Sequence, residues 1–485
     1  MPHRLLLAFA IVLTATFACA NTAPNLVVIF IDDMGYADIG PFGCDAYPTP
    51  HLDQMAAEGR VFTDFHSATA VCSASRAALL TGCYPERVSI LAAFFPGDRR
   101  GLHADETTLA ELLRTRGYAT GCFGKWHLGD DPPHLPTRHG FDEYFGLPYS
   151  NDMWPYLDGE TTFDAGRRMW KWRKPPGPAP PMPLFDGEEI VDADVTPEDQ
   201  EQLTTQYTER AVAFIDRHAG QRPFFCYVPH TMVHVPLFVS DKFRGKSGAG
   251  LYGDVVMELD WSVGQILTAL KRGGVDRDTL VLFTSDNGPW LSFGDHAGSA
   301  GELREGKGTM FEGGYRVPCV MRWPAAIPPG TSCDQLASTM DLLPTMAALV
   351  GAEPADRKID GRDILPLMTG NAPTPHEVFY CYFGRELRAV RDARWKLHLP
   401  HKYRTLGDRQ PGTAGKQNGY EQATIGPELF DLTNDVGETT DVSVNHPEIV
   451  ERLMAHAEVA RQTLGDKLTG REGSEVRPNS QLPRE

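Results

Sequence analysis

The sequence predicts an α/β fold in which helices cover both faces of a β-sheet, followed by a smaller α+β domain. Apolar and β-branched runs alternate with helix-like stretches from residue 25 to residue 284. The runs are continuously apolar, as NLVVIFI at 25–31 illustrates, and this is typical of parallel strands that are buried on both sides. Strands that alternate with helices favour a sheet between two helical layers.

Local start and stop signals support the individual elements. The stretch 49–58 is predicted as a helix that ends at Gly59, and 107–116 as a helix that ends at Gly117, since glycine commonly follows a helix C-terminus. The predicted strands are 25–31, 61–67, 118–123, 223–228 and 279–284, and the other predicted helices are 204–218 and 254–272.

Residues 150–200 interrupt this alternation and are predicted as a long irregular insertion, which in a compact domain is usually functional or disordered. The tryptophans of this region, together with Trp290, could stack on a sugar ring or could pack beneath a long loop, and both interpretations stay open. The insertion contains Trp154, Trp170, Trp172, a proline-rich run at 175–183 and an acidic segment at 186–194.

The C-terminal part has a different pattern. After a glycine- and proline-rich stretch at 370–375, short apolar runs predict a small α+β domain, with a mobile loop at 407–426 and a disordered polar tail after residue 466. Its predicted strands are 378–383, 387–391 and 395–399, and its predicted helix is 447–464.

The N-terminus is predicted to be a signal peptide. Arg4 supplies positive charge, residues 5–17 form a short apolar core, and Ala18-Cys19-Ala20 resembles a small-residue cleavage site. The predicted organisation is therefore a signal peptide at 1–20, a larger domain at 21–370 and a smaller domain at 371–485, in a secreted or periplasmic protein. Lipidation at Cys19 is a minor alternative, because Thr16 stands where lipoproteins usually have an apolar residue.

The composition excludes several classes of partner. A formal net charge of −18 argues against nucleic acid and anionic membranes, and an anionic ligand would need a local cluster of cations. No stretch after the leader is long and apolar enough to predict a transmembrane helix, so no membrane association is expected once the leader is removed. Apart from Cys19 and Cys72, the cysteines show no CxxC spacing, so neither a zinc site nor a regular disulfide framework is indicated.

Cys72 stands immediately before an apolar helix-like run. If a helix begins near Ser73, its unpaired backbone N–H groups would attract an anion beside Cys72, and Arg76 would direct its guanidinium to the same side. This arrangement predicts a reactive position. The alternative is a buried structural cysteine beside a surface arginine, because free cysteine is commonly buried.

Acidic pairs follow two of the predicted strands. Asp32 and Asp33 follow the first strand, and Asp286 and Asn287 follow the strand at 279–284. Ligand sites of open α/β sheets lie where strands end, and an all-oxygen donor set suits Ca²⁺, or less readily Mg²⁺. The alternative for each pair is a turn cap.

Lys125 and His127 follow the strand at 118–123. In an extended segment, residues two apart share a face, so both side chains could reach one site while Trp126 turns away. The alternative is an exposed strand end.

Together these segments resemble the type I sulfatase family. CSASR at 72–76 is similar to the family signature Cys-x-Pro/Ala-x-Arg, and GKWH at 124–127 is similar to a second family motif. The resemblance runs from residue 25 to about residue 441, and it is closest to the branch of arylsulfatase A and N-acetylgalactosamine-6-sulfatase. Three further residues match family positions: the catalytic histidine His234 in HVP, the second active-site lysine Lys307 in GKGT, and the sulfate-contacting serine Ser150 in YSND. By contrast, His230 is predicted to be structural.

The resemblance implies an alkaline-phosphatase-like core and an enzyme that hydrolyses aryl or carbohydrate sulfate esters. It implies that a maturation enzyme oxidises Cys72 to formylglycine, and Ala74 in place of the common proline leaves open which maturation system acts. It also implies a Ca²⁺ ion held by Asp32, Asp33, Asp286 and Asn287.

The resemblance further implies a role for each residue. The hydrate of formylglycine attacks sulfur, His234 or Lys307 protonates the leaving oxygen, and His127 takes a proton so that sulfate is released. Arg76, Lys125 and Lys307 neutralise charge on the sulfuryl oxygens. Two alternatives are a phosphodiesterase or phosphonate monoester hydrolase of the same superfamily, and a non-catalytic protein that binds sulfated glycans.

Overall fold

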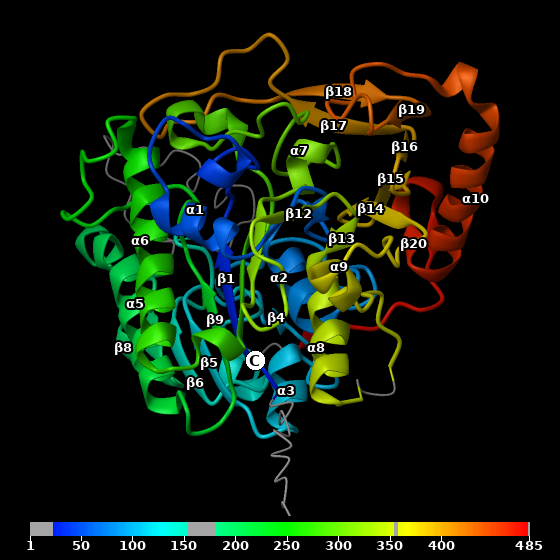
Figure 1. Cartoon of the computed structure of the whole chain (residues 1–485). Helices are drawn as coiled ribbons and strands as arrows, with labels where there is room; N and C mark the ends of the chain where they lie inside the picture. Colours follow the sequence, from blue (N-terminus) through cyan, green and yellow to red (C-terminus); the bar gives the residue numbers. More distant parts are fainter. Residues whose placement is uncertain (1–22, 154–179, 354–356, 484–485) are drawn as a thin grey trace, which may run out of the picture.

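The computed structural model describes residues 23–153, 180–353 and 357–483 (Figure 1). These residues form a large sheet with strand order β12-β2-β11-β10-β1-β9-β5-β6-β7-β8. β1 (Asn25–Ile31) lies in the interior of the sheet, is buried at every residue, and pairs in parallel with β10 (Thr279–Ser285) and β9 (Phe224–Pro229). The other strands are β2 (Arg60–Phe62), β5 (Ala119–Phe123), β6 (Glu143–Gly146), β7 (Leu184–Asp186), β8 (Glu189–Asp192), β11 (Cys319–Arg322) and β12 (Thr331–Cys333).

Helices cover both faces of this sheet, as the sequence predicts (Figure 1). Alternate residues of β1 enter different cores: Val27 and Ile29 pack in a core shared with α1, α5 and α6, whereas Leu26 and Val28 pack in a core shared with α2, α3, α8 and α9. The helices are α1 (Pro50–Ala57), α2 (Cys72–Thr81), α3 (Leu109–Arg114), α5 (Pro197–His218), α6 (Gly250–Arg272), α7 (Glu312–Tyr315), α8 (Leu342–Val350) and α9 (Leu365–Thr369).

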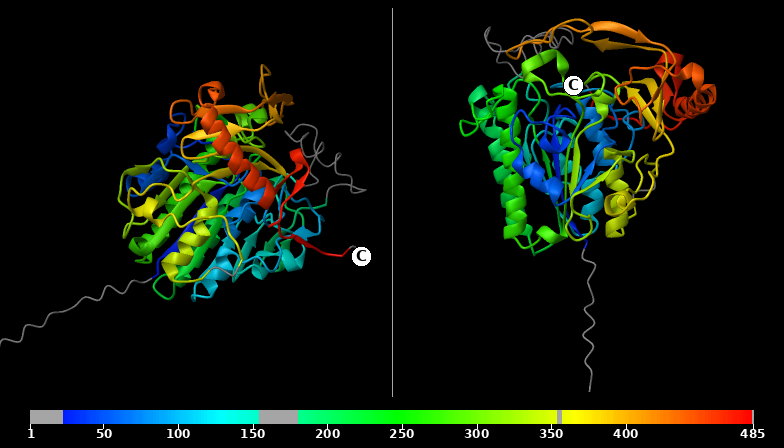
Figure 2. Two further views of the ribbon diagram at one scale, coloured as in Figure 1. Left: turned by 90° about the vertical axis from the view of Figure 1, so that its right-hand side faces the viewer. Right: turned by 45° about the horizontal axis from the view of Figure 1, so that its top comes forward.

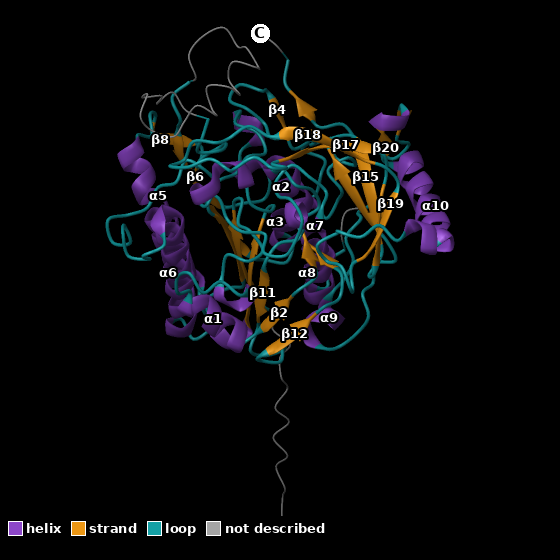
Figure 3. Ribbon diagram, turned by 90° about the horizontal axis from the view of Figure 1, so that it is seen from above, coloured by secondary structure: helices purple, strands orange, loops and turns teal. Residues whose placement is uncertain are grey.

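The C-terminal region forms a smaller antiparallel sheet against which α10 (Pro447–Thr463) packs (Figure 2). This confirms the predicted α+β character. A separate hairpin of β17 (His401–Thr405) and β18 (Glu421–Ile425) lies on the side of the molecule toward which β1 runs (Figures 1 and 3). The sheet consists of β14 (Phe379–Phe383), β15 (Glu386–Arg391), β16 (Trp395–His398) and β19 (Glu428–Asp431).

Two of the differences between predicted and observed boundaries have a clear local cause. α5 begins at Pro197 rather than at residue 204, because Thr196 and Asp199 form a capping box that starts the helix earlier. The predicted strand 61–67 is split into β2 and β3 (Phe65–His66), since β3 pairs with β13 (Ala337–Ser338) in a separate sheet.

The acidic segment 186–194, predicted as part of an irregular insertion, instead contributes to the edge of the large sheet. β7 and β8 form a hairpin whose turn uses Gly187 at φ 63°, and Leu184 and Phe185 are buried. The predicted signal peptide at 1–20 and Trp154, Trp170 and Trp172 lie outside the described residues.

The prediction of a disordered tail after residue 466 is wrong. Here β20 (Gly465–Asp466) pairs with β21 (Arg471–Glu472), and β22 (Ser480–Gln481) pairs with β4 (Arg100–Gly101). The Arg477 guanidinium donates to both carboxylate oxygens of Glu106 at 2.7 Å. Ionic contacts hold this segment, and a polar composition alone does not reveal them.

The predicted mobile loop at 407–426 is also too long. Its last part is β18, and the backbone N–H groups of Gly412 and Asn418 donate to the Ser292 carbonyl at 3.0 and 2.9 Å. Among the described residues, no helix has the length and apolar character needed to cross a membrane.

Candidate active site

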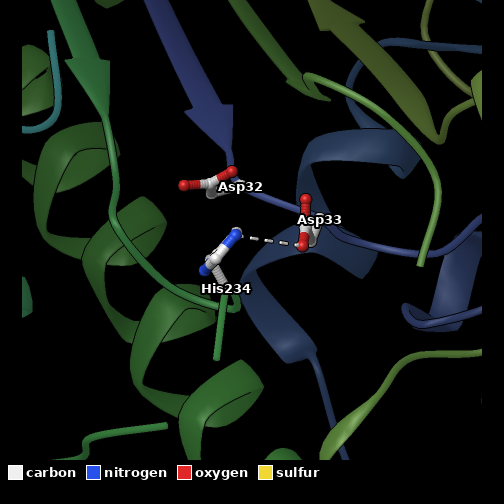
Figure 4. A group of neighbouring side chains, drawn as sticks. All are labelled: Asp32, Asp33 and His234. Atoms are coloured by element: carbon white, nitrogen blue, oxygen red, sulfur yellow. Dashed lines mark ion pairs between the residues drawn. The ribbon is translucent and has the colours of Figure 1, made fainter. Parts of the chain in front are cut away.

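The predicted site residues gather at the carboxyl ends of the central parallel strands. The register of β1 and β10 brings Asp32 and Asp286, which directly follow these two strands, side by side. In Figure 4, His234 reaches from the loop after β9 toward Asp32 and Asp33. This edge of the sheet is where open α/β folds place their ligands.

The acidic residues form one connected set. The Asp33 backbone N–H donates to Asp286 Oδ1 at 3.1 Å, and Asn287 Nδ2 donates to Asp33 Oδ1 at 2.8 Å. Asp33 has a φ of 65°, which is unusual for a residue other than glycine. The left-handed turn places the adjacent carboxylates of Asp32 and Asp33 in one site, as the sequence argument requires.

Two oxygens of this set have no hydrogen-bond partner among the described residues. These buried atoms are Asp32 Oδ1 and Asn287 Oδ1. A buried unsatisfied acceptor costs about 1–3 kcal/mol. Burial and the proximity of Asp32 raise the pKa of the Asp286 carboxyl to about 7. The donors are oxygens only, so the set fits a hard cation such as Ca²⁺.

Each of the three carboxylates forms its shortest ion pair with a different cationic side chain. Burial alone would raise the pKa of Asp32, but the surrounding cations, Lys125 foremost, hold it well below its usual range. Burial would lower the pKa of Lys307, but Asp33 raises it overall. Arg76 Nη2 donates to Asp286 Oδ2 at 2.9 Å, Lys307 Nζ to Asp33 Oδ1 at 2.6 Å, and Lys125 Nζ to Asp32 Oδ2 and, at 3.1 Å, to Ser150 Oγ.

Cys72 is the first residue of α2, one residue before the predicted start, and its side chain is buried. Burial raises the pKa of the thiol, although Lys125 and Lys307 lower it. The thiol is therefore protonated at neutral pH, and the unmodified cysteine is not an activated nucleophile.

His127 is set up to accept a proton. Its Nε2 lies 2.9 Å from the Phe94 carbonyl oxygen, which can only accept, so Nε2 carries the proton and Nδ1 is the acceptor. Among the described residues Nδ1 has no partner, and burial together with the charge of Lys125 holds the pKa of the ring well below its usual range, so the ring is neutral and the lone pair of Nδ1 is unoccupied. The segment is not extended here, contrary to the prediction, because His127 has a φ of 64°.

The two histidines after β9 differ in their surroundings. His234 Nδ1 donates to the Val235 carbonyl at 2.6 Å, which leaves Nε2 facing Asp33 Oδ2 at 3.6 Å. His230 instead contacts Ser262 Oγ at 3.2 Å, and burial lowers the pKa of its ring to about 3. This environment supports the prediction of a structural role for His230.

A cavity of about 150 Å³ opens above Cys72. Four predicted site residues line it: Cys72, Ser150, His234 and Lys307. The sequence argument missed Asp152, Phe383 and Arg404, which also line it. Asp152 lies two residues after Ser150 in the same segment and could have been noticed, and its Oδ1 is buried without a partner among the described residues.

Arg404 reaches the pocket from the C-terminal hairpin. Its Nε donates to the Lys307 carbonyl oxygen at 2.9 Å, and its guanidinium lies 5.9 Å from the centre of the Trp290 ring. Lys307 Nζ lies 4.9 Å from the same ring. No local sequence pattern identifies Arg404, because only the packing of β17 brings it here.

A cation-rich pocket, a buried cysteine at a helix start and oxygen donors suited to a metal are features that suit a hydrolase acting on an anionic ester. The site combines these features on an alkaline-phosphatase-like fold. The family model for sulfatases matches residues 24–352, and the model for the C-terminal region of aryl-sulfatase matches residues 374–481. The chain belongs to the sulfatase family, and its reaction is the hydrolysis of sulfate esters.

Individual relatives agree with this assignment. Arylsulfatase A of Bos taurus is 40% identical over 453 residues, covering 90% of this chain and 86% of that protein. N-acetylgalactosamine-6-sulfatase of Canis lupus familiaris is 38% identical over 475 residues, covering 92% and 86%. The solved structure of Ps i-CgsB in complex with k-i-k-neocarrahexaose is 29% identical, with a TM-score of 0.72 over 90% of this chain and 92% of that one.

Proposed function

We propose that this sulfatase uses formylglycine at residue 72 and a calcium ion to hydrolyse sulfate esters on a carbohydrate. The observation that carries the proposal is the convergence of oxygen donors with unpartnered atoms next to Cys72. In the part of the chain that the structure describes, Asp32 Oδ1 and Asn287 Oδ1 are buried acceptors without a donor. Asp33 and Asp286 would complete the calcium ligands.

The unreactive state of the thiol supports the modification. A buried, protonated thiol is a poor nucleophile, yet Cys72 occupies the helix start that faces the cations. When present, formylglycine supplies a nucleophilic oxygen at this position, and calcium supplies positive charge beside it.

Other side chains of this protein bind the sulfate group and transfer protons. Arg76, Lys125 and Lys307 neutralise charge on the sulfuryl oxygens, which is the kind of preorganised electrostatic effect that usually contributes most to catalysis. Ser150, held by Lys125 at 3.1 Å, contacts the sulfate group. His127 Nδ1 accepts a proton from residue 72.

His234 donates a proton to the leaving oxygen. Its Nδ1 is committed to the Val235 carbonyl, so Nε2 is the atom available to the substrate in the pocket. Proton transfer to a leaving group is worth about 10²–10⁴-fold.

A carbohydrate substrate fits the walls of the pocket. Trp290 and the carboxylate residue Asp152 both line the pocket, a combination suited to a sugar ring and its hydroxyl groups. The complex of Ps i-CgsB with a neocarrahexaose shows that a relative binds an oligosaccharide. We further propose the division into domains at residue 370, a cleaved signal peptide, secretion or export to the periplasm, and a maturation enzyme that acts on Cys72.

Comparing sulfate release from 4-nitrocatechol sulfate with hydrolysis of an aryl phosphate diester tests this proposal. We expect the sulfate ester to be the better substrate, exhaustive chelation to abolish its turnover, and Ca²⁺ to restore turnover better than Zn²⁺. Preference for the phosphate diester, or full activity after chelation, would overturn the proposal.

A further inference from the structure

Ser73, the residue that follows Cys72, makes a contact that the proposed reaction does not yet use. Its side chain is fully buried in the first turn of α2, and its Oγ accepts a hydrogen bond from the backbone N–H of Phe94 at 3.1 Å. Ser75 lies in the same turn and is equally buried, yet its Oγ has no hydrogen-bond partner among the described residues. The hydroxyl group of Ser73, unlike that of Ser75, therefore holds a segment that lies 21 residues away in the sequence.

Phe94 belongs to a stretch of chain without regular secondary structure. The structure describes every residue between α2 and β4, and this stretch contains no helix or strand. The Phe94 ring is buried in the core shared with α2 and α3, whereas its neighbours Ala93 and Phe95 line the pocket at Cys72. The hydrogen bond to Ser73 therefore fixes the backbone of a pocket wall.

The carbonyl group of Phe94 has a partner that acts in the proposed reaction. Its oxygen lies 2.9 Å from His127 Nε2, and among the described residues this is the one hydrogen bond of the His127 ring. The backbone N–H of His127 donates to the Pro148 carbonyl oxygen at 3.0 Å, which places the backbone but not the ring. The Phe94 carbonyl therefore determines which ring nitrogen carries the proton.

The two hydrogen bonds of Phe94 connect the reactive position with the histidine that accepts its proton. Ser73 directly follows residue 72 and holds the N–H of Phe94. The C=O of Phe94 holds the ring of His127. Because both backbone groups of Phe94 are bound, its carbonyl oxygen cannot turn away without leaving a buried polar group unpaired, which is costly. The helix turn that carries residue 72 thus also fixes the segment that orients His127.

We propose that Ser73 is a positioning residue for His127. Through Phe94 it holds the tautomer in which Nε2 carries the proton, and so keeps the lone pair of Nδ1 available to residue 72. This inference rests on the proposed function, because it concerns the step in which Nδ1 takes the proton of a hydroxyl group at residue 72. In that step the sulfate leaves with the electron pair of its bond to this residue.

Single-turnover kinetics with radiolabelled 4-nitrocatechol sulfate tests the proposal, because nitrocatechol and sulfate leave in different steps. The full chain is used with Ca²⁺, and rates are divided by the formylglycine content of the tryptic peptide 61–76, so that differences in maturation cancel. Ser73→Ala should release nitrocatechol within about twofold of the parent rate but sulfate about tenfold more slowly, which is the factor that corresponds to about 1.4 kcal/mol. Unchanged sulfate release, or equal loss in both steps, would overturn the proposal.

Ser75→Ala is the matched control. It removes a hydroxyl group from the same buried helix turn, but no hydrogen bond among the described residues is lost with it. Both rates, corrected for formylglycine content, should equal those of the parent. If Ser75→Ala slows sulfate release as much as Ser73→Ala does, the effect belongs to the helix turn as a whole and the specific role of Ser73 is refuted.

A double-mutant cycle separates positioning of His127 from a purely structural role. If Ser73 acts through the His127 ring, Ser73→Ala should slow sulfate release about tenfold in the parent but less than about twofold in protein that already carries His127→Gln. Equal factors in the two backgrounds would contradict the proposal even where Ser73→Ala alone slows the reaction.

The tautomer of His127 gives a readout that does not depend on turnover. In protein with nitrogen-15-labelled histidine at neutral pH, NMR signals of this ring are assigned by their loss in His127→Gln. They should show a proton on Nε2 in the parent and a smaller fraction of this tautomer in Ser73→Ala. The same tautomer fraction in both proteins would refute the positioning role. If the parent releases no sulfate from 4-nitrocatechol sulfate while the tautomer still shifts, the proposed function fails and the positioning of His127 by Ser73 stands.

Discussion

The cluster at Cys72 and a second cluster around Glu312 are both buried, and both combine carboxylates with basic side chains. We call the first the active-site cluster, made of Asp32, Asp33, Asp286, Asn287, Arg76, Lys125 and Lys307. We call the second the interdomain cluster, made of Asp64, His66, Glu312, Arg316, Arg391, Lys396, His398 and Glu438. They differ in whether every carboxylate and amide oxygen has a hydrogen-bond donor among the described residues.

In the interdomain cluster, every carboxylate oxygen has a donor. Arg391 donates to Asp64 Oδ2 at 2.8 Å and to Glu312 Oε2 at 3.0 Å, and Lys396 bridges Glu312 at 3.0 Å and Glu438 at 2.9 Å. Despite burial, these cations hold the pKa of the Glu312 carboxyl well below its usual range. In the active-site cluster, Asp32 Oδ1 lacks a donor, and the pKa of Asp286 is raised to about 7.

This difference distinguishes a cluster whose oxygens are all paired within the protein from one that leaves oxygens for a ligand. The carboxylate oxygens of Asp64 and Glu312 are all paired with donors, so neither offers a free oxygen to a metal, although donor atoms of these residues and His66 lie within 4.8 Å of one another. The interdomain cluster also supports the site, because Glu312 follows Lys307 closely in sequence and is fixed by strands of the C-terminal part.

The largest expected effect comes from Cys72→Ala. Sulfate release from 4-nitrocatechol sulfate should fall on the order of 10⁶-fold, as is typical for loss of a covalent nucleophile. The Tm should stay within a few degrees of the parent, because Cys72 takes part in no closed ion pair. If the variant keeps its turnover, or if it loses cooperative unfolding as well as activity, the distinction between the two clusters fails.

His234→Ala is expected to have the next largest effect, and one that depends on the substrate. Turnover of a sugar sulfate should fall about 10²–10⁴-fold, whereas an activated aryl sulfate should lose far less, since a good leaving group needs little protonation. His230→Gln serves as the control and should show no dependence on the leaving group. Equal losses on both substrates in His234→Ala would reassign the acid to Lys307.

Glu312→Gln should destabilise the protein by about 3–5 kcal/mol in denaturant unfolding, because Lys396 and Arg391 would remain buried without their partner. The matched control is Glu188→Gln, whose partner Arg138 is exposed, and it should lower the free energy of unfolding far less than Glu312→Gln does. Similar costs for the two variants would mean that the interdomain cluster contributes no more than a surface pair.

Much of the fold and the site could be predicted from the sequence. Buried parallel strands such as 25–31 are recognisable because both faces are apolar, and the residues after them fall at the same edge of the sheet. Local rules therefore placed Asp32 and Asp286 together. The family signature around Cys72 then selected the chemistry, which geometry alone leaves open.

What the sequence did not reveal depends on long-range packing. Arg404 reaches Lys307 only because the β17–β18 hairpin folds over the site, and Arg391 reaches Asp64 across the boundary between the two sheets. The tail after residue 466 is polar, yet Arg477 anchors it to Glu106. Ion pairs between distant segments leave no periodic signal in a single sequence.

The smallest expected effect is the pH dependence of His398 in the interdomain cluster. Burial lowers the pKa of this ring although Glu438 acts in the opposite direction, so below about pH 6.5 the unfolded chain binds a proton that the folded protein does not. Stability should therefore fall as the pH falls. His398→Gln should reduce the slope of the unfolding free energy against pH by up to about 1.4 kcal/mol per pH unit in denaturant unfolding between pH 6.5 and 5. An unchanged slope would show that protonation of this ring does not cause the pH dependence.

The central claim is that the active-site cluster acts together with a modified residue 72. The mass of the tryptic peptide 61–76 from active protein tests this claim most directly. Trypsin releases this peptide whole, since the arginines at 60 and 76 bound it and no lysine or arginine lies between them. The account predicts that residue 72 in the active fraction carries an aldehyde or its hydrate in place of the thiol. Unmodified cysteine at residue 72 throughout a fully active sample would contradict the account.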